Sequence, residues 1–143
     1  MSVDCEVNSS LYNEFLESNQ TLRVYKDDRL IFSSQKERLL PLLEYMDTCV
    51  PYEHDVTIFD RVVGNAAALL FMLVNCKEVF SPLASDIAVA TLDTRGIRYH
   101  FMDTVPCIQN QRRDDLCPME KLSIGKEPEE FYQALIELRK HKI

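Results

Sequence analysis

Cys117-Pro118-Met119-Glu120 is the segment whose residue types point most directly to chemistry. Proline is favoured at the first position of a helix, so Pro118 predicts a short helix with Cys117 at its N-cap and Glu120 at its third position. A thiol at an N-cap lies near the positive end of the helix dipole, which favours the reactive thiolate. Glu120 is placed to reach back to the Cys117 backbone in a capping box. A cysteine that only caps a turn would need no chemistry.

Two acidic residues follow predicted strands and are candidates for the same site. Asp60 ends a short buried strand over residues 56–59, and Asp103 follows a strand over residues 97–102. Open sheets with parallel strands bind their ligands outside the carboxyl ends of those strands. We therefore predict that Asp60, Asp103 and Cys117 converge on one concave site. The alternative is a helix N-cap for Asp60 and a strand-ending turn for Asp103.

The connections near these strands hold the other candidate ligand-binding residues, which are Gly64, Asn65, Ser81, Ser85, Arg112 and Arg113. Glycine lets a backbone or a ligand approach closely, and Ser85 fits the N-cap of the next helix. The two arginines lie in a long polar loop over residues 104–116, where adjacent guanidinium groups could clamp a phosphate. As solvated loop charges they would need no ligand.

The spacing of apolar residues predicts the elements that position these candidates. Besides the short helix after Cys117, helices are predicted over residues 8–18, 62–74, 86–94 and 128–140. One more helix follows Ser34, either from a capping box of Ser34 with Glu37 or, as Pro41 favours, from near Leu40. The predicted strands cover residues 21–26, 30–34, 56–59, 78–81 and 97–102.

The order of these elements predicts the fold. Residues 62–74 are apolar nearly all round, so this helix should lie at the centre of the domain. Strands that alternate with helices through short connections pair in parallel with right-handed crossovers, and residues 21–34 add an N-terminal antiparallel hairpin. We predict one α/β domain over residues 1–143, a three-layer α/β/α arrangement around a mixed sheet of about five strands.

Composition excludes several classes of protein. The chain has 143 residues and a net charge of −7, without the clustered basic residues of a general nucleic-acid binder. No apolar run approaches the roughly 20 residues of a membrane-spanning helix, and no signal-peptide pattern is present, so we expect a cytoplasmic protein without membrane contact. Five cysteines without a C-x-x-C pair favour neither disulfides nor a zinc ribbon, and we expect no metal or cofactor.

Three segments form a pattern across most of the chain: Asp60-Arg61-Val62-Val63-Gly64-Asn65-Ala66-Ala67-Ala68, Ser81-Pro82-Leu83-Ala84-Ser85 and Cys117-Pro118-Met119-Glu120. Together they resemble a small bacterial family of unknown function that is placed in the cytidine-deaminase-like fold superfamily. That family commonly has a lysine where this chain has Asn65. The resemblance implies a deaminase-like fold. Zinc deaminases also need a His or Cys with a Glu at one helix N-terminus and P-C-x-x-C at another, and the corresponding segments here contain neither.

Two hypotheses about function follow from a deaminase-like fold without a zinc site. The first, which we favour, is a binding or regulatory module for a nucleoside- or nucleotide-like small molecule. The second is a metal-independent enzyme on a nucleotide-like substrate, with Cys117 as nucleophile and Asp60 and Glu120 as its catalytic partners. Either could act as a homo-oligomer.

Overall fold

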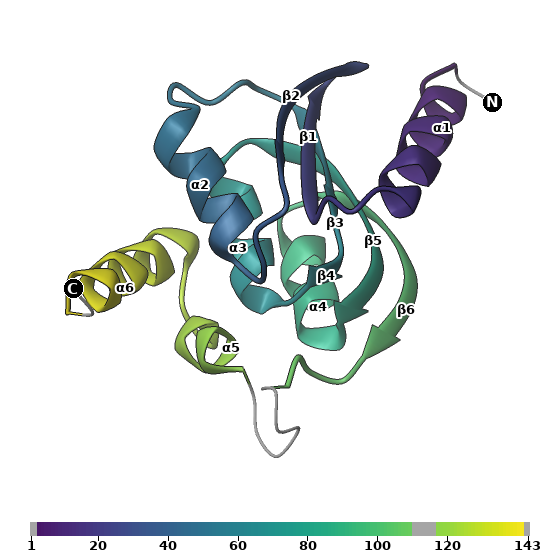
Figure 1. Ribbon diagram of the computed structural model, residues 1–143. Helices are drawn as coiled ribbons and strands as arrows, with labels where there is room; N and C mark the ends of the chain where they lie inside the picture. Colours follow the sequence, from purple (N-terminus) through teal and green to yellow (C-terminus); the bar gives the residue numbers. More distant parts are fainter. Residues whose placement is uncertain (1–2, 110–116, 142–143) are drawn as a thin grey trace.

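The computed structural model describes residues 3–109 and 117–141, in which six helices and six strands follow one another (Figure 1). The helices are α1 (Val3–Glu17), α2 (Leu40–Thr48), α3 (Asn65–Leu73), α4 (Asp86–Thr94), α5 (Pro118–Ser123) and α6 (Pro128–His141). The strands are β1 (Leu22–Lys26), β2 (Arg29–Ser34), β3 (Val56–Asp60), β4 (Val62–Val63), β5 (Cys76–Ser85) and β6 (Arg98–Val105). The chain is therefore a mixed α/β protein.

The strands form one mixed open sheet, in which β2, β1, β3, β5 and β6 lie side by side in that order. β1 is antiparallel to both β2 and β3, whereas β3, β5 and β6 are parallel, as predicted. Leu83 of β5 pairs with Val62 of β4 on one side and with Asp103 of β6 on the other. Strand β4 therefore continues the line of β3 along β5, and the carboxyl ends of the parallel strands meet at one end of the sheet.

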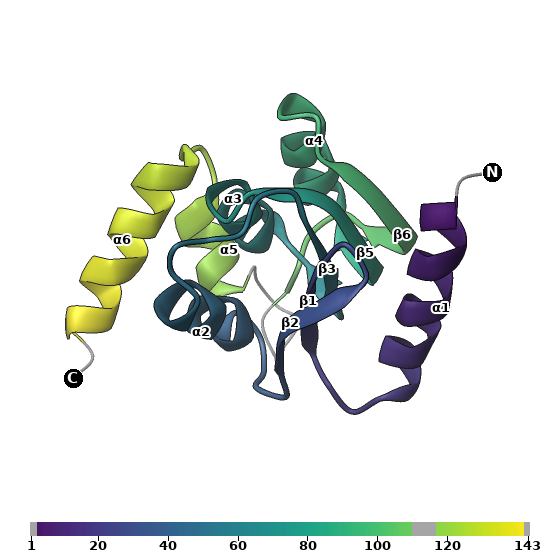
Figure 2. The same cartoon turned by 90° about the horizontal axis from the view of Figure 1, so that it is seen from above.

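The helices cover the two faces of the sheet unequally, with α1 on one face and α2 to α6 on the other (Figures 1 and 2). The larger apolar core lies under α2, α3 and α6 and includes the fully buried Leu70 and Phe131. A smaller aromatic cluster joins Phe15 of α1 to Tyr25 and Phe59 of the sheet. Within the described ranges, no helix combines the length and the apolarity that crossing a membrane requires.

Helix α3 lies in the larger core, as predicted, but it begins at Asn65 rather than at residue 62. Val62 and Val63 form β4 instead, because β-branched residues fit a pleated strand and here pair with β5. Strand β5 also extends over Cys76–Ser85 rather than residues 78–81, since β4 and β6 pair with its second half. The segments that lead into α3 and α4 are therefore the strands β4 and β5.

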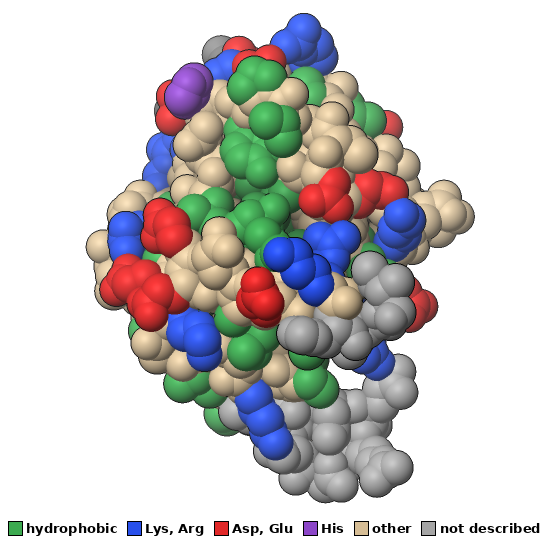
Figure 3. Space-filling view, turned by 90° about the vertical axis from the view of Figure 1, so that its left-hand side faces the viewer, with side chains coloured by type: hydrophobic (Ala, Val, Ile, Leu, Met, Phe, Trp, Pro, Cys, Tyr) green, Lys and Arg blue, Asp and Glu red, His purple; other side chains and the backbone are tan. Residues whose placement is uncertain are grey.

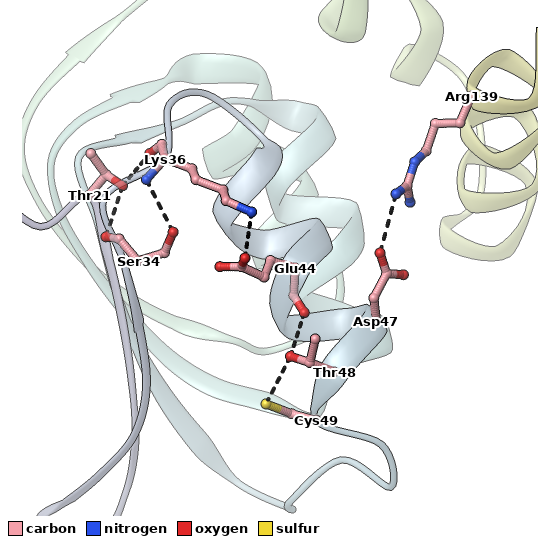
Figure 4. A network of polar contacts seen from close by, with 8 residues as sticks. All are labelled: Thr21, Ser34, Lys36, Glu44, Asp47, Thr48, Cys49 and Arg139. Carbon is pink, nitrogen blue, oxygen red and sulfur yellow. Dashed lines mark hydrogen bonds and ion pairs between the residues drawn. The ribbon is translucent and has the colours of Figure 1, made fainter. Parts of the chain in front are cut away.

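The start of α2 decides between the two predicted alternatives. The helix begins at Leu40 with Pro41 in its first turn, and the alternative capping box of Ser34 with Glu37 is wrong. Ser34 is the last residue of β2, and its hydroxyl accepts a hydrogen bond of 3.1 Å from the backbone N–H of Lys36 (Figure 4). The Ser34 side chain therefore belongs to a turn after the strand and not to the helix.

Two exposed ion pairs connect α2 with its neighbours (Figure 4). Lys36 Nζ lies 2.5 Å from Glu44 Oε2, and an Arg139 nitrogen of α6 lies 3.2 Å from Asp47 Oδ2. Exposed pairs of this kind contribute about 0–1 kcal/mol each. Hydrophobic side chains gather in the middle of the face that carries α2 and α6, with charges of both signs around them (Figure 3). Apolar contacts such as that of the partly buried Tyr132 with the core therefore hold this face together.

Candidate functional site

The carboxyl ends of the parallel strands bring predicted site residues to one end of the sheet. Asp60 is the last residue of β3, and Asp103 lies near the end of β6, opposite Leu83 of β5. The two carboxylates differ in their surroundings, because Asp60 is 9% exposed whereas Asp103 is an exposed residue. Only Asp60 is therefore held within the protein.

Asp60 is fixed by the backbone of the break between β3 and β4. Its carboxylate accepts hydrogen bonds from the backbone N–H groups of Arg61, at 2.8 Å, and of Val62. The predicted alternative of a helix N-cap is wrong for Asp60, because Gly64 is the N-cap of α3. Burial raises the pKa of the Asp60 carboxyl to about 7, although the two N–H groups act in the opposite direction. This side chain is therefore a buried acid that titrates near neutral pH.

The stability of the protein is expected to fall as the pH rises from about 4 to about 7. Asp60 has a pKa of about 7 in the folded chain and an ordinary value of 3.8, so the folded state keeps the proton over this range. Asp60→Asn cannot ionise, and its gain in unfolding free energy over wild type should be larger at pH 8 than at pH 4. We expect a difference above about 1.4 kcal/mol, which corresponds to a tenfold change in proton affinity.

Urea unfolding of both proteins at the two pH values measures this difference. Asp103→Asn removes an exposed carboxylate from the same end of the sheet and controls for the change in net charge. If the gain of Asp60→Asn over wild type were the same at pH 4 and pH 8, Asp60 would not be the titrating group.

Arg61, the residue after Asp60, reaches the helix on the opposite face of the sheet. Its guanidinium donates to the carbonyls of Phe15 at 2.9 Å, of Ser18 at 2.7 Å and of Gln20 at 3.0 Å, at the C-terminal end of α1. It also lies 4.5 Å from the centre of the Phe15 ring, within range of a cation–π interaction. Arg61 thus helps to satisfy carbonyls at the end of the helix, and the Phe15 carbonyl also accepts from the N–H and hydroxyl of Ser18.

The carboxylate of Glu120 closes the N-terminus of α3. Its Oε2 and Oε1 accept hydrogen bonds from the backbone N–H groups of Asn65 and Ala66, both at 2.9 Å, and Glu120 is 3% exposed. The predicted capping box with Cys117 is wrong, because the Cys117 N–H donates to the carbonyl of Ile108. The partial positive charge and unpaired N–H groups of the α3 N-terminus are therefore satisfied within the chain.

Gly64 makes room for this carboxylate. A Cβ atom at Gly64 would lie 2.5 Å from Oε1 of Glu120, closer than atoms can pack. The side chain of the next residue, Asn65, is also buried, and it donates to the carbonyl and hydroxyl of Ser123 at the end of α5. Its amide oxygen accepts a hydrogen bond from Thr91 of α4. Glu120 and Asn65 together join the start of α3 to α4 and α5.

The remaining candidates have separate positions. Ser85 is the N-cap of α4, as predicted, and its hydroxyl accepts from the Ala88 N–H at 3.0 Å. The fully buried Ser81 hydroxyl donates to the carbonyl of Leu83. Cys117 is the N-cap of α5, as predicted, with a free and partly exposed thiol. Its convergence with Asp60 and Asp103 stays a prediction.

Two points remain, the loop arginines and the arrangement of possible metal ligands. Arg112 and Arg113 lie outside the described residues. Among residues 3–109 and 117–141, no group of three or more His, Cys, Asp or Glu side chains is arranged to hold a metal ion.

A groove of about 530 Å³ runs between α3 and α4, beside the connection from α5 to α6. Its apolar side chains come from these segments and from the start of α6, and are Leu69, Met72, Ile87, Ala90, Ile124 and Pro128. Asn65 and Thr91 contribute polar atoms, whereas Asp60, Asp103 and Cys117 do not line this groove. The groove therefore shares Asn65 with the predicted ligand-binding residues but is separate from the predicted meeting point of Asp60, Asp103 and Cys117.

Comparison with known proteins places this geometry in a family. A family model described as a domain of unknown function (DUF1893) matches residues 10–138. The chain belongs to the DUF1893 family. A solved structure of a DUF1893 family protein (TM1506) from Thermotoga maritima has a TM-score of 0.84 and 22% sequence identity. The similarity covers 95% of this chain and 92% of that one, and at this identity it shows the fold alone. No curated protein matches the sequence.

The match confirms the expected membership of a family of unknown function. Of the residues that the sequence analysis named as candidates, Asn65 lines the groove, whereas the other lining residues were missed. A signal for the groove exists in α4, where Ile87, Ala90 and Thr94 recur at helical spacing and all line the groove. That spacing marks a face of α4 turned away from Leu92, which is fully buried.

Proposed function

We propose that this DUF1893 chain is a small-molecule-binding or regulatory module whose ligand occupies the groove between α3 and α4. The groove itself is the observation that carries the proposal. Its volume of about 530 Å³ lies within the roughly 300–1,000 Å³ of small-molecule pockets. Such pockets combine apolar walls with a few polar groups, and here Leu69 and Ile87 provide walls while Thr91 and Arg95 provide polar groups. A nucleoside- or nucleotide-like molecule has the matching composition of a flat ring with polar substituents.

The contacts of two candidate catalytic residues support binding rather than the enzymatic alternative. That alternative needs Asp60 and Glu120 as partners of Cys117. The Asp60 carboxylate is engaged by backbone N–H groups of the β3–β4 break, and both oxygens of Glu120 are engaged at α3. The described partners of both carboxylates are thus backbone N–H groups, and the Cys117 thiol is free. The same residues have structural functions that the fold requires.

We also propose that the fold is cytidine-deaminase-like, with its ligand site displaced. The parallel strands β3, β5 and β6 and the helices that follow the first two support this proposal. Zinc deaminases place their metal and catalytic motifs at two helix N-termini. Here α3 and α4 begin with Gly64-Asn65 and Ser85-Asp86, and Glu120 fills the first of these places. The groove between α3 and α4 then offers a concavity beside this closed place.

Ala90→Phe is expected to weaken ligand binding at least about tenfold, because the ring would fill the groove. Ala90 lines the groove and is exposed, so the protein should remain folded. Isothermal titration calorimetry with adenosine, cytidine, guanosine, uridine and their 5′-monophosphates measures the affinities. Gln133→Phe, at an exposed position of α6 outside the groove lining, is the matched control.

The proposed function would be wrong if none of these compounds bound the wild-type chain at millimolar concentration. Unchanged affinity in Ala90→Phe would place the ligand elsewhere. Equal losses in Ala90→Phe and Gln133→Phe would show an effect of added surface phenylalanine rather than of the groove.

A further inference from the structure

Charged side chains gather where the groove meets the connection between α5 and α6. Arg95, the C-cap of α4, and Lys126 are the cations that line the groove, and Glu127 is its carboxylate. The lining therefore has a net positive charge in a chain whose total charge is −7. An anionic ligand group is favoured at this rim, although it would be repelled by the protein as a whole.

Arg95 is held by Glu127 across the rim. An Arg95 guanidinium nitrogen lies 2.6 Å from Glu127 Oε2, and the two side chains are 50% and 65% exposed. Exposed pairs of this kind contribute little to stability, so Glu127 can be displaced by another anion. Lys126 is held differently, because its Nζ donates to the backbone carbonyl of Leu122 at 2.7 Å. Its charge therefore has a neutral partner and remains available to an anion.

The cations lie beside the apolar walls, so a ligand that fits both has an apolar ring next to an anionic group. Ile87, Ala90 and Leu69 offer an apolar surface to a ring, and Arg95 lies on α4 directly after this surface. A guanidinium binds a phosphate through two parallel hydrogen bonds, which a single carboxylate oxygen of Glu127 does not match. A ring that carries a phosphate would therefore contact the walls and replace Glu127 at the same time.

We propose that the groove selects ligands that combine a flat ring with a phosphate group, as nucleoside monophosphates do. Arg95 binds this phosphate after displacing Glu127. The inference rests on the proposed function and adds the chemical class of the ligand. Arg95 then acts as the specificity-determining cation, Lys126 adds positive charge beside it, and Glu127 acts as an internal competitor. A neutral nucleoside would contact the same walls without displacing Glu127.

Calorimetric titration of the full chain with AMP and adenosine, and with CMP and cytidine, tests this selection. We expect each monophosphate to bind at least about tenfold more tightly than its nucleoside. The ratio should fall when the salt concentration is raised, because charges at an exposed rim are screened. Inorganic phosphate alone should bind more weakly than the monophosphates, since it makes no contact with the apolar walls.

Two variants assign the selection to named residues. Arg95→Gln should reduce the ratio to less than about twofold and leave the nucleoside affinity unchanged. Glu127→Gln should raise the monophosphate affinity several-fold, because the competing carboxylate is gone. Arg139→Gln is the matched control, since Arg139 is 47% exposed, pairs with the exposed Asp47 and does not line the groove.

Different outcomes separate this inference from the proposed function. Equal affinities of nucleoside and monophosphate in wild type would overturn the phosphate selection and leave the binding module intact. Binding of neither would overturn both. Equal losses of monophosphate affinity in Arg95→Gln and Arg139→Gln would show a general effect of charge. If inorganic phosphate bound as tightly as AMP, the ring would make no contribution to binding.

Discussion

Replacing Leu70 with alanine is expected to lower the free energy of unfolding by about 2–5 kcal/mol. Leu70 is fully buried on α3, in the larger core. Truncation removes its apolar contacts and leaves a cavity that the surrounding helices and strands fill only in part. Urea unfolding followed by circular dichroism measures the change.

Leu40→Ala is the control for the loss of a leucine side chain on a helix. Leu40 is 58% exposed at the start of α2, so its truncation should change the stability by no more than about 0.5 kcal/mol. A change as small as this for Leu70→Ala would show that α3 is not at the centre of the core.

Replacing Glu120 with alanine is expected to lower the free energy of unfolding by about 2–4 kcal/mol. The substitution leaves the backbone N–H groups of Asn65 and Ala66 without partners, and these residues are only 4% and 3% exposed. It also removes one of the two hydrogen-bonded links between α5 and α3 and leaves the hydrogen bonds of Asn65 to Ser123. Glu129→Ala, at an exposed acidic residue in the first turn of α6, is the control and should have little effect.

The effect of Gly64→Ala on stability should depend on whether Glu120 is present. In wild type the new methyl group would overlap the Glu120 carboxylate, at 2.5 Å, and should destabilise the protein by about 1–3 kcal/mol. In Glu120→Ala the space is empty, and alanine should be neutral or slightly stabilising because it restricts the unfolded chain. A destabilisation of the same size in both backgrounds would show that Gly64 and Glu120 do not interact.

Local signals in the sequence were sufficient for most of the elements. Ser85 caps α4 through a hydrogen bond that spans three residues, and Gly96 has a φ of +70° after the end of that helix. Both effects depend on adjacent backbone and can be predicted from residue type and position. The boundary at Val62 was wrong because pairing with β5 overrides the apolar pattern, and that pairing depends on a partner about twenty residues away.

Contacts between distant segments were beyond the reach of such signals. The Glu120 carboxylate binds N–H groups 54 and 55 residues earlier in the chain, and nothing in the residues around position 120 specifies α3 as its partner. The spacing favoured Cys117 because it lies three residues before Glu120, as a capping box requires. The groove is similar, since Leu69, Arg95 and Lys126 line one space only after α3, α4 and α6 have packed.

The hydrogen bonds of Arg61 also determine when α1 can be attached to the rest of the protein during synthesis. They join Arg61 to carbonyls 41 to 46 residues earlier, at the end of α1. At roughly 5–20 residues per second, a ribosome adds Arg61 about two to nine seconds after these carbonyls. During that interval the Phe15 carbonyl can still accept from the nearby Ser18 N–H and hydroxyl, but these carbonyls lack the guanidinium of Arg61. Phe15 of α1 also lacks Phe59 of β3, against which it packs in the folded chain. Helix α1 is therefore attached to the sheet by a residue that is synthesised well after it.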